Sequence, residues 1–210
     1  VGVAAPAWAE GQSTNPQLSV NEGRVKITSK LTMDKYAVEP NADFNYTITP
    51  AEASELTNTG MPVTAGVQEA VSLSPSSLNY SAKDLPSVDN ADGVTKTISA
   101  PISVSLDTLK FPAPGIYRYK ITQTSPVLDG LNVEYKELFL DVYVENGNSG
   151  LVAKGCTLST AAGSGDKTSG FENKYATHKL TIKKVVAGNQ GDKNKDFEFT
   201  VTIKGADGEA

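Results

Sequence analysis

The protein has 210 residues with a formal net charge of −5 at pH 7, and apolar residues make up 39% of the chain, enough for a packed core. No apolar run reaches the ~20 residues that a bilayer-spanning helix needs, and the acidic balance leaves no basic surface for nucleic acid. One Cys and one His exclude an internal disulfide framework and argue against a Cys/His zinc site or a Ser-His-Asp triad. We therefore expect a protein that is not an enzyme and has no catalytic residues, cofactor, metal, small-molecule substrate or nucleic-acid partner.

Two segments precede the first strand-like pattern. Residues 1–9 read VGVAAPAWA, and the closing Ala7-Trp8-Ala9 fits the small-x-small cleavage pattern at the end of a secretory signal peptide, although a merely Ala-rich tail is the alternative. Residues 10–23 are polar, contain Gly, Pro and Asn, and lack a helical period, which indicates a flexible leader. The N-terminal segments thus predict an exported protein.

From residue 24 onward, the chain consists of short runs in which Thr, Val, Ile and Tyr alternate with polar residues, a pattern typical of half-buried strands. Turn-forming clusters of Gly, Pro, Asn and Ser separate the runs, and this spacing favours a β-sandwich over βαβ units. The predicted strands are 24–33, 43–49, 70–74, 97–106, 115–122, 138–144 and 151–158, and 51–58 is predicted as a short loop helix. The residues predicted to face the core include Val25, Ile27, Phe44, Tyr46, Ile48, Ile121, Leu140 and Val142.

Two stretches roughly one domain length apart share a design. Residues 25–49 and 180–203 each contain an alternating strand, a polar connection, and the motif D-F-x-[YF]-T-[IV]-T. Repetition over a domain length indicates tandem homologous domains rather than a solenoid. About two strands cannot bury their own apolar face. We therefore expect one whole domain at 24–175 and the truncated first strands of a second domain at 176–210.

Several motifs resemble those of a known family. The segments are GIYRYKITQ at 115–123, EYKELFLDVYV at 134–144, and GFENKY at 170–175 running into LTIKKVVAGNQGDKNKDFEFTVTI. They resemble the backbone (shaft) pilins of Gram-positive sortase-assembled pili, in particular the streptococcal-type isopeptide-linkage domains. The resemblance covers 24–204 and is weak over 51–112. It implies an Ig-like β-sandwich, polymerisation with other pilin subunits by a sortase, a place on the cell surface or cell wall, and Lys–Asn isopeptide bonds in at least some domains.

The chemistry of such a bond follows from burial. A Lys amine in an apolar core loses the hydration of its charge, so the neutral, nucleophilic form becomes available. A neighbouring carboxylic acid, kept protonated by the same burial, polarises the Asn carboxamide and transfers protons while ammonia leaves. The amide that forms joins the first strand to the last and limits the entropy of the unfolded chain, as a disulfide would.

The resemblance gives different results for the two domains. In the second domain it places the bond-forming lysine at Lys184, the fifth position of L-T-x-x-K, with partners beyond residue 210. In the first domain only Asn173 matches, because Ser29 stands at the lysine position and Gln123 at the position of the acid. Serine has no amine and glutamine cannot act as a neutral acid. We therefore expect this domain to lack the bond and to hold these three side chains in a hydrogen-bonded cluster.

Neighbouring residues offer alternatives for the missing groups. Lys30 could replace Ser29 if a β-bulge turned its side chain inward. Glu134, Glu137 or Asp141 could replace the acid if one of them faced the same pocket.

One loop lysine is a candidate for polymerisation. Lys167 lies in the Gly/Ser-rich loop GSGDKTSG, close to where the resembling family presents its sortase-acceptor lysine, and an exposed loop lysine suits an enzyme that must bring an acyl donor to it. The alternative function is a multi-domain surface adhesin that binds a host or partner molecule through loops such as 51–69 or 81–96, since tandem sandwich modules serve either purpose.

Overall fold

The structure is a computed structural model that describes residues 18–57, 61–176, 185 and 198–200. The chain divides into two compact units, Val1–Thr177 and His178–Ala210, and every strand described below belongs to the first. Within the described ranges no helix has the length and apolarity needed to cross a membrane.

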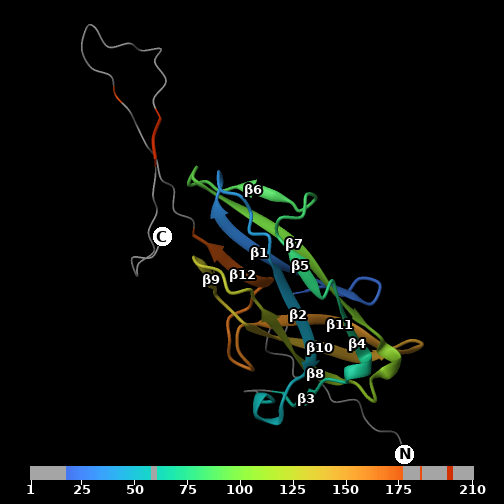
Figure 1. The fold of residues 1–210 in the computed structure, drawn as a ribbon. Helices are drawn as coiled ribbons and strands as arrows, with labels where there is room; N and C mark the ends of the chain where they lie inside the picture. The colour runs from blue at the N-terminus through green and yellow to red at the C-terminus, as the bar shows by residue number, and fades with distance from the viewer. Residues whose placement is uncertain (1–17, 58–60, 177–184, 186–197, 201–210) are drawn as a thin grey trace, which may run out of the picture. The chain divides into compact units, whose positions relative to one another are not determined.

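The first unit is a sandwich of two six-stranded sheets (Figure 1). The first sheet has the order β4 (Val71–Ser74), β7 (Thr95–Leu106), β1 (Arg24–Asp34), β12 (Gly170–Tyr175) and β9 (Leu131–Val133), with β6 (Ser87–Asp89) paired to β7. The second has the order β11 (Gly150–Ser159), β10 (Glu137–Gly147), β8 (Gly115–Thr124), β2 (Asp43–Pro50) and β5 (Ser77–Asn79), with β3 (Val63–Ala65) paired to β8. The helices described are three single 3-10 turns, η1 (Ala53–Glu55), η2 (Gln68–Ala70) and η3 (Thr108–Lys110). The all-β sandwich predicted from the sequence is confirmed.

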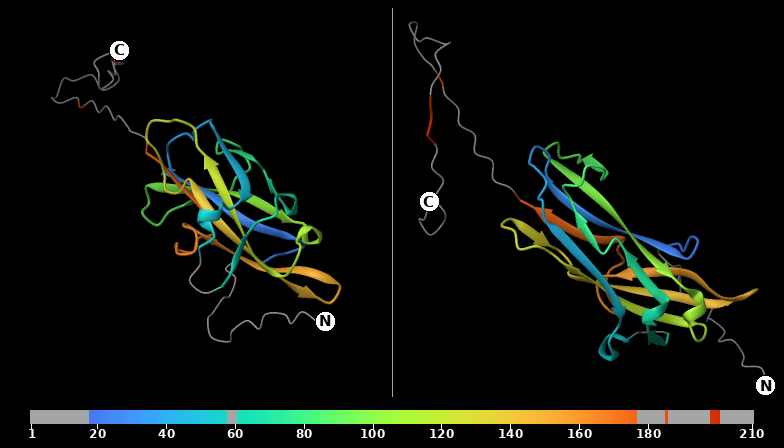
Figure 2. Two further views of the ribbon diagram at one scale, coloured as in Figure 1. Left: turned by 90° about the horizontal axis from the view of Figure 1, so that it is seen from below. Right: turned by 45° about the vertical axis from the view of Figure 1, so that its right-hand side comes forward.

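The first and last strands of the sandwich lie side by side in the middle of the first sheet, as Figure 2 shows. They run parallel, with a register from Thr28↔Gly170 to Met33↔Tyr175, and β3 also pairs parallel to β8, so the expectation of a purely antiparallel sandwich needs correction. β12 enters the sheet beside Thr28 and ends beside Met33, which gives it the same direction as β1. Glycine is required at this entry, since a Cβ on Gly170 would lie 1.7 Å from the Thr28 carbonyl oxygen.

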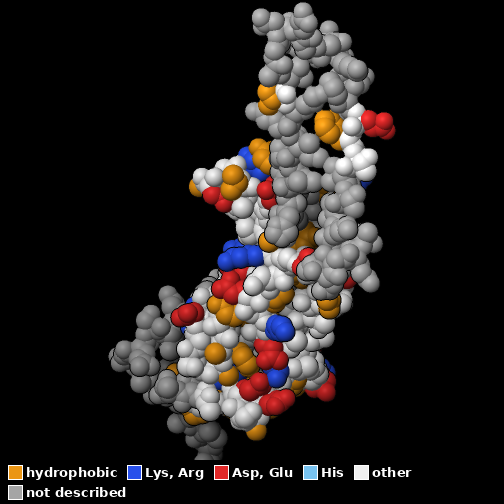
Figure 3. Space-filling model, turned by 60° about the vertical axis from the view of Figure 1, so that its left-hand side comes forward, with side chains coloured by type: hydrophobic (Ala, Val, Ile, Leu, Met, Phe, Trp, Pro, Cys, Tyr) orange, Lys and Arg blue, Asp and Glu red, His pale blue; other side chains and the backbone are white. Residues whose placement is uncertain are grey.

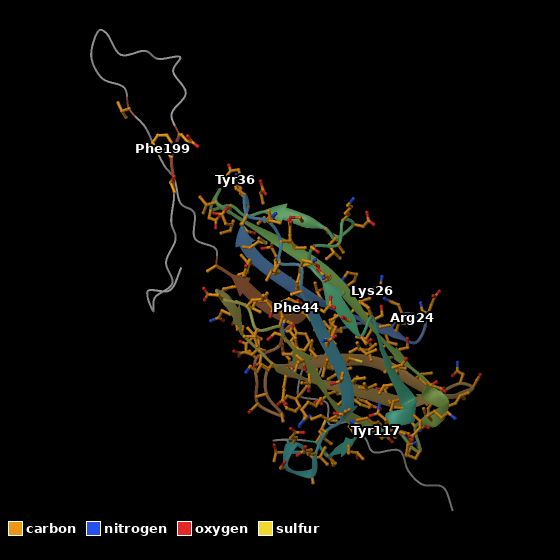
Figure 4. All side chains as sticks on the ribbon, viewed as in Figure 1. Arg24, Lys26, Tyr36, Phe44, Tyr117 and Phe199 are labelled. Carbon is orange, nitrogen blue, oxygen red and sulfur yellow. The ribbon has the colours of Figure 1, made fainter. Side chains whose placement is uncertain are left out.

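The core lies between the two sheets and follows the alternation read from the sequence. All eight residues predicted to face inward are buried, with exposed fractions of at most 8%. Phe44 of β2 and Tyr117 of β8, both labelled in Figure 4, belong to this core. On β1 every second side chain from Val25 to Met33 is buried, because successive side chains of a strand point to opposite faces.

The end of the predicted flexible leader is structured instead. Leu18 exchanges two backbone hydrogen bonds, of 2.8 and 2.9 Å, with Cys156, and Leu18 and Val20 pack on the core. The physical reason is that β11 is an edge strand whose N–H and C=O groups need partners, which the segment before β1 supplies. Residues 1–17, with the predicted signal-peptide end, lie outside the described residues.

The helix predicted over 51–58 is also shorter than expected. Only η1 forms, a single 3-10 turn in which Glu52 N donates to Glu55 Oε2 at 2.7 Å. The carbonyl oxygens of Glu55 and Thr57 accept hydrogen bonds from Arg118 instead of continuing a helical ladder. A tertiary contact therefore ends the helix after one turn.

Candidate functional site

The structure brings together the three residues predicted at the degenerate isopeptide site. Ser29 of β1, Gln123 of β8 and Asn173 of β12 point inward from both sheets and are at most 2% exposed. Gln123 Nε2 donates to Asn173 Oδ1 at 2.8 Å, and Ser29 Oγ lies 3.4 Å from Gln123 Oε1. The three side chains are separate and hydrogen-bonded in this structure.

Two tyrosines complete this site. The Ser29 hydroxyl lies 2.7 Å from the hydroxyl of Tyr46 and 2.6 Å from that of Tyr80, and Tyr46 donates to Gln123 Oε1 at 3.0 Å. Tyr46 was predicted only as a core residue, and Tyr80 was missed. The available signal was the place of Tyr46 between Phe44 and Ile48 on the inward side of its strand, because a phenol buried there requires a hydrogen-bond partner.

We call Ser29, Tyr46, Tyr80, Gln123 and Asn173 the core polar cluster. Asn173 Nδ2 donates to the Lys30 carbonyl oxygen and to Gln123 Oε1, both at 3.2 Å, and to the Tyr80 hydroxyl at 3.4 Å. Each buried polar atom of the cluster has a partner, so none incurs the cost of about 1–3 kcal/mol that an unpaired buried group carries. Burial raises the pKa of both phenols, which keeps the cluster uncharged.

Aromatic rings enclose the cluster. The Phe44 and Tyr80 rings meet edge to face with centroids 5.0 Å apart, and the Tyr46 and Phe171 rings lie 5.5 Å apart across the two sheets. These contacts hold the two phenol rings in place.

Lys30 does not take the place of Ser29 in this structure. Both ladders of β1 run through this region without a register shift, so no bulge turns the side chain inward. Its Nζ lies 3.9 Å from Glu172 Oε1 on the outward face, where the Lys30 side chain is 38% exposed.

The three alternative acids also lie elsewhere. Glu134 and Glu137 are exposed. Asp141 lies between the core residues Leu140 and Val142 and so points to the outer face of the second sheet, where it binds Arg118. Asp141 thus faces away from the core polar cluster, and Glu134 and Glu137 line a surface pocket together with Gln123.

Lys167, the predicted acceptor, is exposed at the end of a compact loop. We call residues 160–167 the acceptor loop. The backbone hydrogen bonds Thr160 N to Asp166 O and Thr168 N to Leu158 O, both 3.0 Å, close its base. Lys167 Nζ lies 3.5 Å from Ser159 Oγ. The loop is therefore a closed turn that presents the lysine. Lys184, predicted for the second domain, lies outside the described residues.

The charged side chains on one face of the molecule are mixed in sign. On the face shown in Figure 3, acidic and basic side chains lie next to one another without a patch of one sign. In the part of the chain that the structure describes, no group of three or more His, Cys, Asp or Glu residues could hold a metal ion.

The first and last strands of the sandwich thus pair within one sheet, and a buried Asn on the last strand lies beside the first. Residues 25–176 match the family described as Spy0128-like isopeptide containing domain, and the chain belongs to this family. Residues 178–210 match a domain of unknown function.

Two known proteins are similar over most of the chain. A curated relative named Pilin, from Streptococcus pyogenes serotype M1, is 26% identical over 206 residues, which are 97% of this chain and 56% of the relative. A crystal structure of a mutant of the major pilin from Streptococcus pyogenes covers 81% of this chain and 57% of that chain, with 24% identity and a TM-score of 0.50, which supports the fold. The chain thus spans little more than half the length of these relatives.

Proposed function

We propose that this chain is part of a structural subunit of a pilus on a Gram-positive cell surface, assembled with other pilin subunits by a sortase. The observation that carries the proposal is the match of residues 25–176 to the isopeptide-domain family, together with a relative named Pilin that aligns with 97% of the chain. The role is mechanical rather than catalytic.

The strand arrangement supports a load-bearing role. β1 and β12 are the first and last strands of the sandwich, and they pair in parallel over six residue pairs. Tension between the two ends would pull the strands in opposite directions along their length. Under such shear, the hydrogen bonds between β1 and β12 bear the force simultaneously.

We infer that the first domain performs this role without a Lys–Asn bond. Ser29 offers no amine, Lys30 lies on the outward face, and Asn173 is hydrogen-bonded within the core polar cluster between the two sheets. In the repeat that begins near residue 180, we propose Lys184 as the bond-forming lysine, with partners beyond residue 210.

Lys167 is the proposed acceptor of polymerisation. Its deprotonated amine attacks the thioester carbon of a sortase cysteine that carries the end of another subunit. A C–N bond forms, the C–S bond breaks, and the released thiolate takes up the proton that the amine loses.

The proposal is tested by incubating the protein with a cognate pilin sortase and a second pilin subunit. Wild type should form a ladder of covalent polymers, and Lys167→Arg should remain folded but monomeric, because arginine stays protonated and is a poor nucleophile. An unchanged ladder would reject Lys167 as the acceptor. Tight binding to host surface molecules with no ladder from wild type would favour the adhesin alternative.

A further inference from the structure

A buried ion pair lies on the outer face of the second sheet, away from the core polar cluster. Arg118 of β8 is 2% exposed and stands directly opposite Asp141 of β10. Its Nε donates to Asp141 Oδ1 at 2.7 Å and its Nη2 to Oδ2 at 2.8 Å. A buried ion pair is weak evidence for stability, since apolar residues of similar volume often serve as well. The pair therefore calls for another explanation.

The same guanidinium holds the segment that covers it. Arg118 Nη1 donates to the carbonyl oxygens of Glu55 at 2.7 Å and Thr57 at 2.9 Å. On the same strand, Lys120 Nζ binds Glu55 Oε1 at 2.9 Å. The turn at 53–57 is thus attached to the outer face of the sheet through β8.

The acceptor loop rests on this turn. Gly163, in the middle of the loop, has a φ of +75°, and a Cβ added there would lie 2.2 Å from the Thr57 carbonyl oxygen and 3.6 Å from Arg118 Nη1. The loop backbone therefore contacts the carbonyl group that Arg118 orients. Direct contacts connect Asp141 to Arg118, Arg118 to Thr57, and Thr57 to Gly163.

We propose that the Arg118–Asp141 pair is a positioning device for Lys167, acting through the 53–57 turn and Gly163. The inference rests on the proposed acceptor role of Lys167. A transferase must bring its thioester carbon to the lysine nitrogen in a defined orientation, and a misplacement of about 1 Å can slow such a reaction by as much as 10²-fold. The pair fixes the height and direction of the acceptor loop above the sheet.

A matched pair of glycine variants tests this contact. Gly163→Ala places a methyl group against the Thr57 carbonyl oxygen, whereas Gly93→Ala has the same backbone cost, at a φ of +74°, with no atom within 4 Å of the new Cβ. The quantity to measure is the rate at which a preloaded pilin sortase transfers a fluorescent sorting-signal peptide to the full chain. Gly163→Ala should lower the second-order rate constant about tenfold or more. Gly93→Ala should stay within about twofold of wild type.

A second variant tests the ion pair itself. Arg118→Lys keeps the charge but cannot bind the carboxylate with two donors and both carbonyl oxygens at once. It should slow transfer as Gly163→Ala does, and the double variant should be no slower than the worse single one, because both act through the same contact. A small N-hydroxysuccinimide ester, which needs no defined approach, should label Lys167 equally in wild type and in the Gly163, Gly93 and Arg118 variants.

Each outcome decides between the two proposals. If Lys167→Arg still accepts the peptide at the wild-type rate, the acceptor role fails. If Lys167→Arg abolishes transfer while folded Gly163→Ala and Arg118→Lys match Gly93→Ala, the acceptor role stands and the positioning role is overturned. Equal loss of ester labelling and peptide transfer would also overturn it, because the effect would then be one of exposure and not of orientation.

Discussion

Two groups of buried polar side chains in the sandwich are built differently. The core polar cluster lies between the sheets, is uncharged, and consists of side chains that satisfy one another. The Arg118–Asp141 pair lies on the outer face and is charged. Arg118 donates two hydrogen bonds to Asp141 and two to backbone carbonyl groups of a turn. The first arrangement links strands to strands, and the second links a sheet to a loop. The comparison separates groups that hold the fold from groups that we propose to position Lys167.

The largest effect is expected from introducing a Lys–Asn isopeptide bond at the core polar cluster. Ser29→Lys together with Gln123→Glu supplies an amine and an acid beside Asn173. A bond between β1 and β12 closes a loop of more than 100 residues, worth about 5 kcal/mol in the chain-entropy model. We expect a higher unfolding temperature by calorimetry, together with a loss of ~17 Da as ammonia leaves. Asn173→Ala in the same background should abolish both changes, and a mass loss that persists there would show that another amide reacts.

Breaking the outer pair should have the next largest effect. Arg118→Met leaves the buried Asp141 carboxylate without its partner, which should cost about 3–5 kcal/mol in urea unfolding. The double change Arg118→Met and Asp141→Leu removes both charges and should regain most of that loss. If the pair positions the acceptor loop, the sortase should still transfer the peptide slowly to Lys167 of the double variant. A double variant that recovers both the free energy of unfolding and the rate of peptide transfer would contradict the positioning role of the pair.

Glu55, in the turn that Arg118 holds, and the core polar cluster should make stability depend on pH at opposite ends of the scale. Burial disfavours ionisation of Glu55, but the backbone N–H of Glu52 and the Lys120 ammonium outweigh it and hold the pKa of Glu55 below its usual 4.5. Its contribution to the unfolding free energy is therefore complete above pH 4.5 and is lost as the pH falls through the lower folded-state value. Burial raises the pKa of Tyr46 and Tyr80 above 10, so the contribution of the core polar cluster is complete below pH 10 and is lost as the pH rises through the folded-state values.

Urea unfolding across the pH range checks this prediction. Glu55→Gln should flatten the acid limb of the stability profile, and it also changes the alkaline limb because the Glu55 carboxylate raises the pKa of Lys120. Tyr80→Phe should flatten the alkaline limb and leave the acid limb unchanged. An acid limb that moves with Tyr80→Phe would show that the two regions are coupled.

The smallest effect is expected at Lys30, next to Ser29 in sequence but on the opposite face. Its ion pair with Glu172 is long and exposed, so Lys30→Ala should change the unfolding free energy by less than about 0.5 kcal/mol. High salt should leave this small difference no larger, because exposed pairs are screened. A loss of several kcal/mol would mean that Lys30 reaches the core.

Three residues of the core polar cluster could be predicted as a site from the sequence, and the Arg118–Asp141 pair could not. Alternation along β1 placed Ser29 inward, and the motifs of β8 and β12 added Gln123 and Asn173. Tyr80 escaped because it follows the three-residue strand β5 in a stretch with little periodic pattern. Short strands leave few positions from which the inward face can be recognised.

The outer pair was hidden for a different reason. Arg118 lies between the core residues Tyr117 and Tyr119, on the face that alternation assigns to solvent. Its burial comes from the 53–57 turn and the acceptor loop, which approach from elsewhere in the chain. Strand periodicity contains no information about such covering segments, so only the tertiary structure reveals that a charged residue is buried there.

The intact mass of the folded chain tests most directly whether the first domain works without an isopeptide bond. Mass spectrometry of the wild-type protein, with peptide mapping around Asn173, should give the unmodified mass and an Asn173 peptide that is not cross-linked, while Ser29→Lys with Gln123→Glu, measured in parallel, loses ~17 Da. A wild-type mass lower by that amount, with Asn173 joined to Lys30 or to another lysine of β1, would contradict the assignment of the core polar cluster as a hydrogen-bonded substitute for the bond.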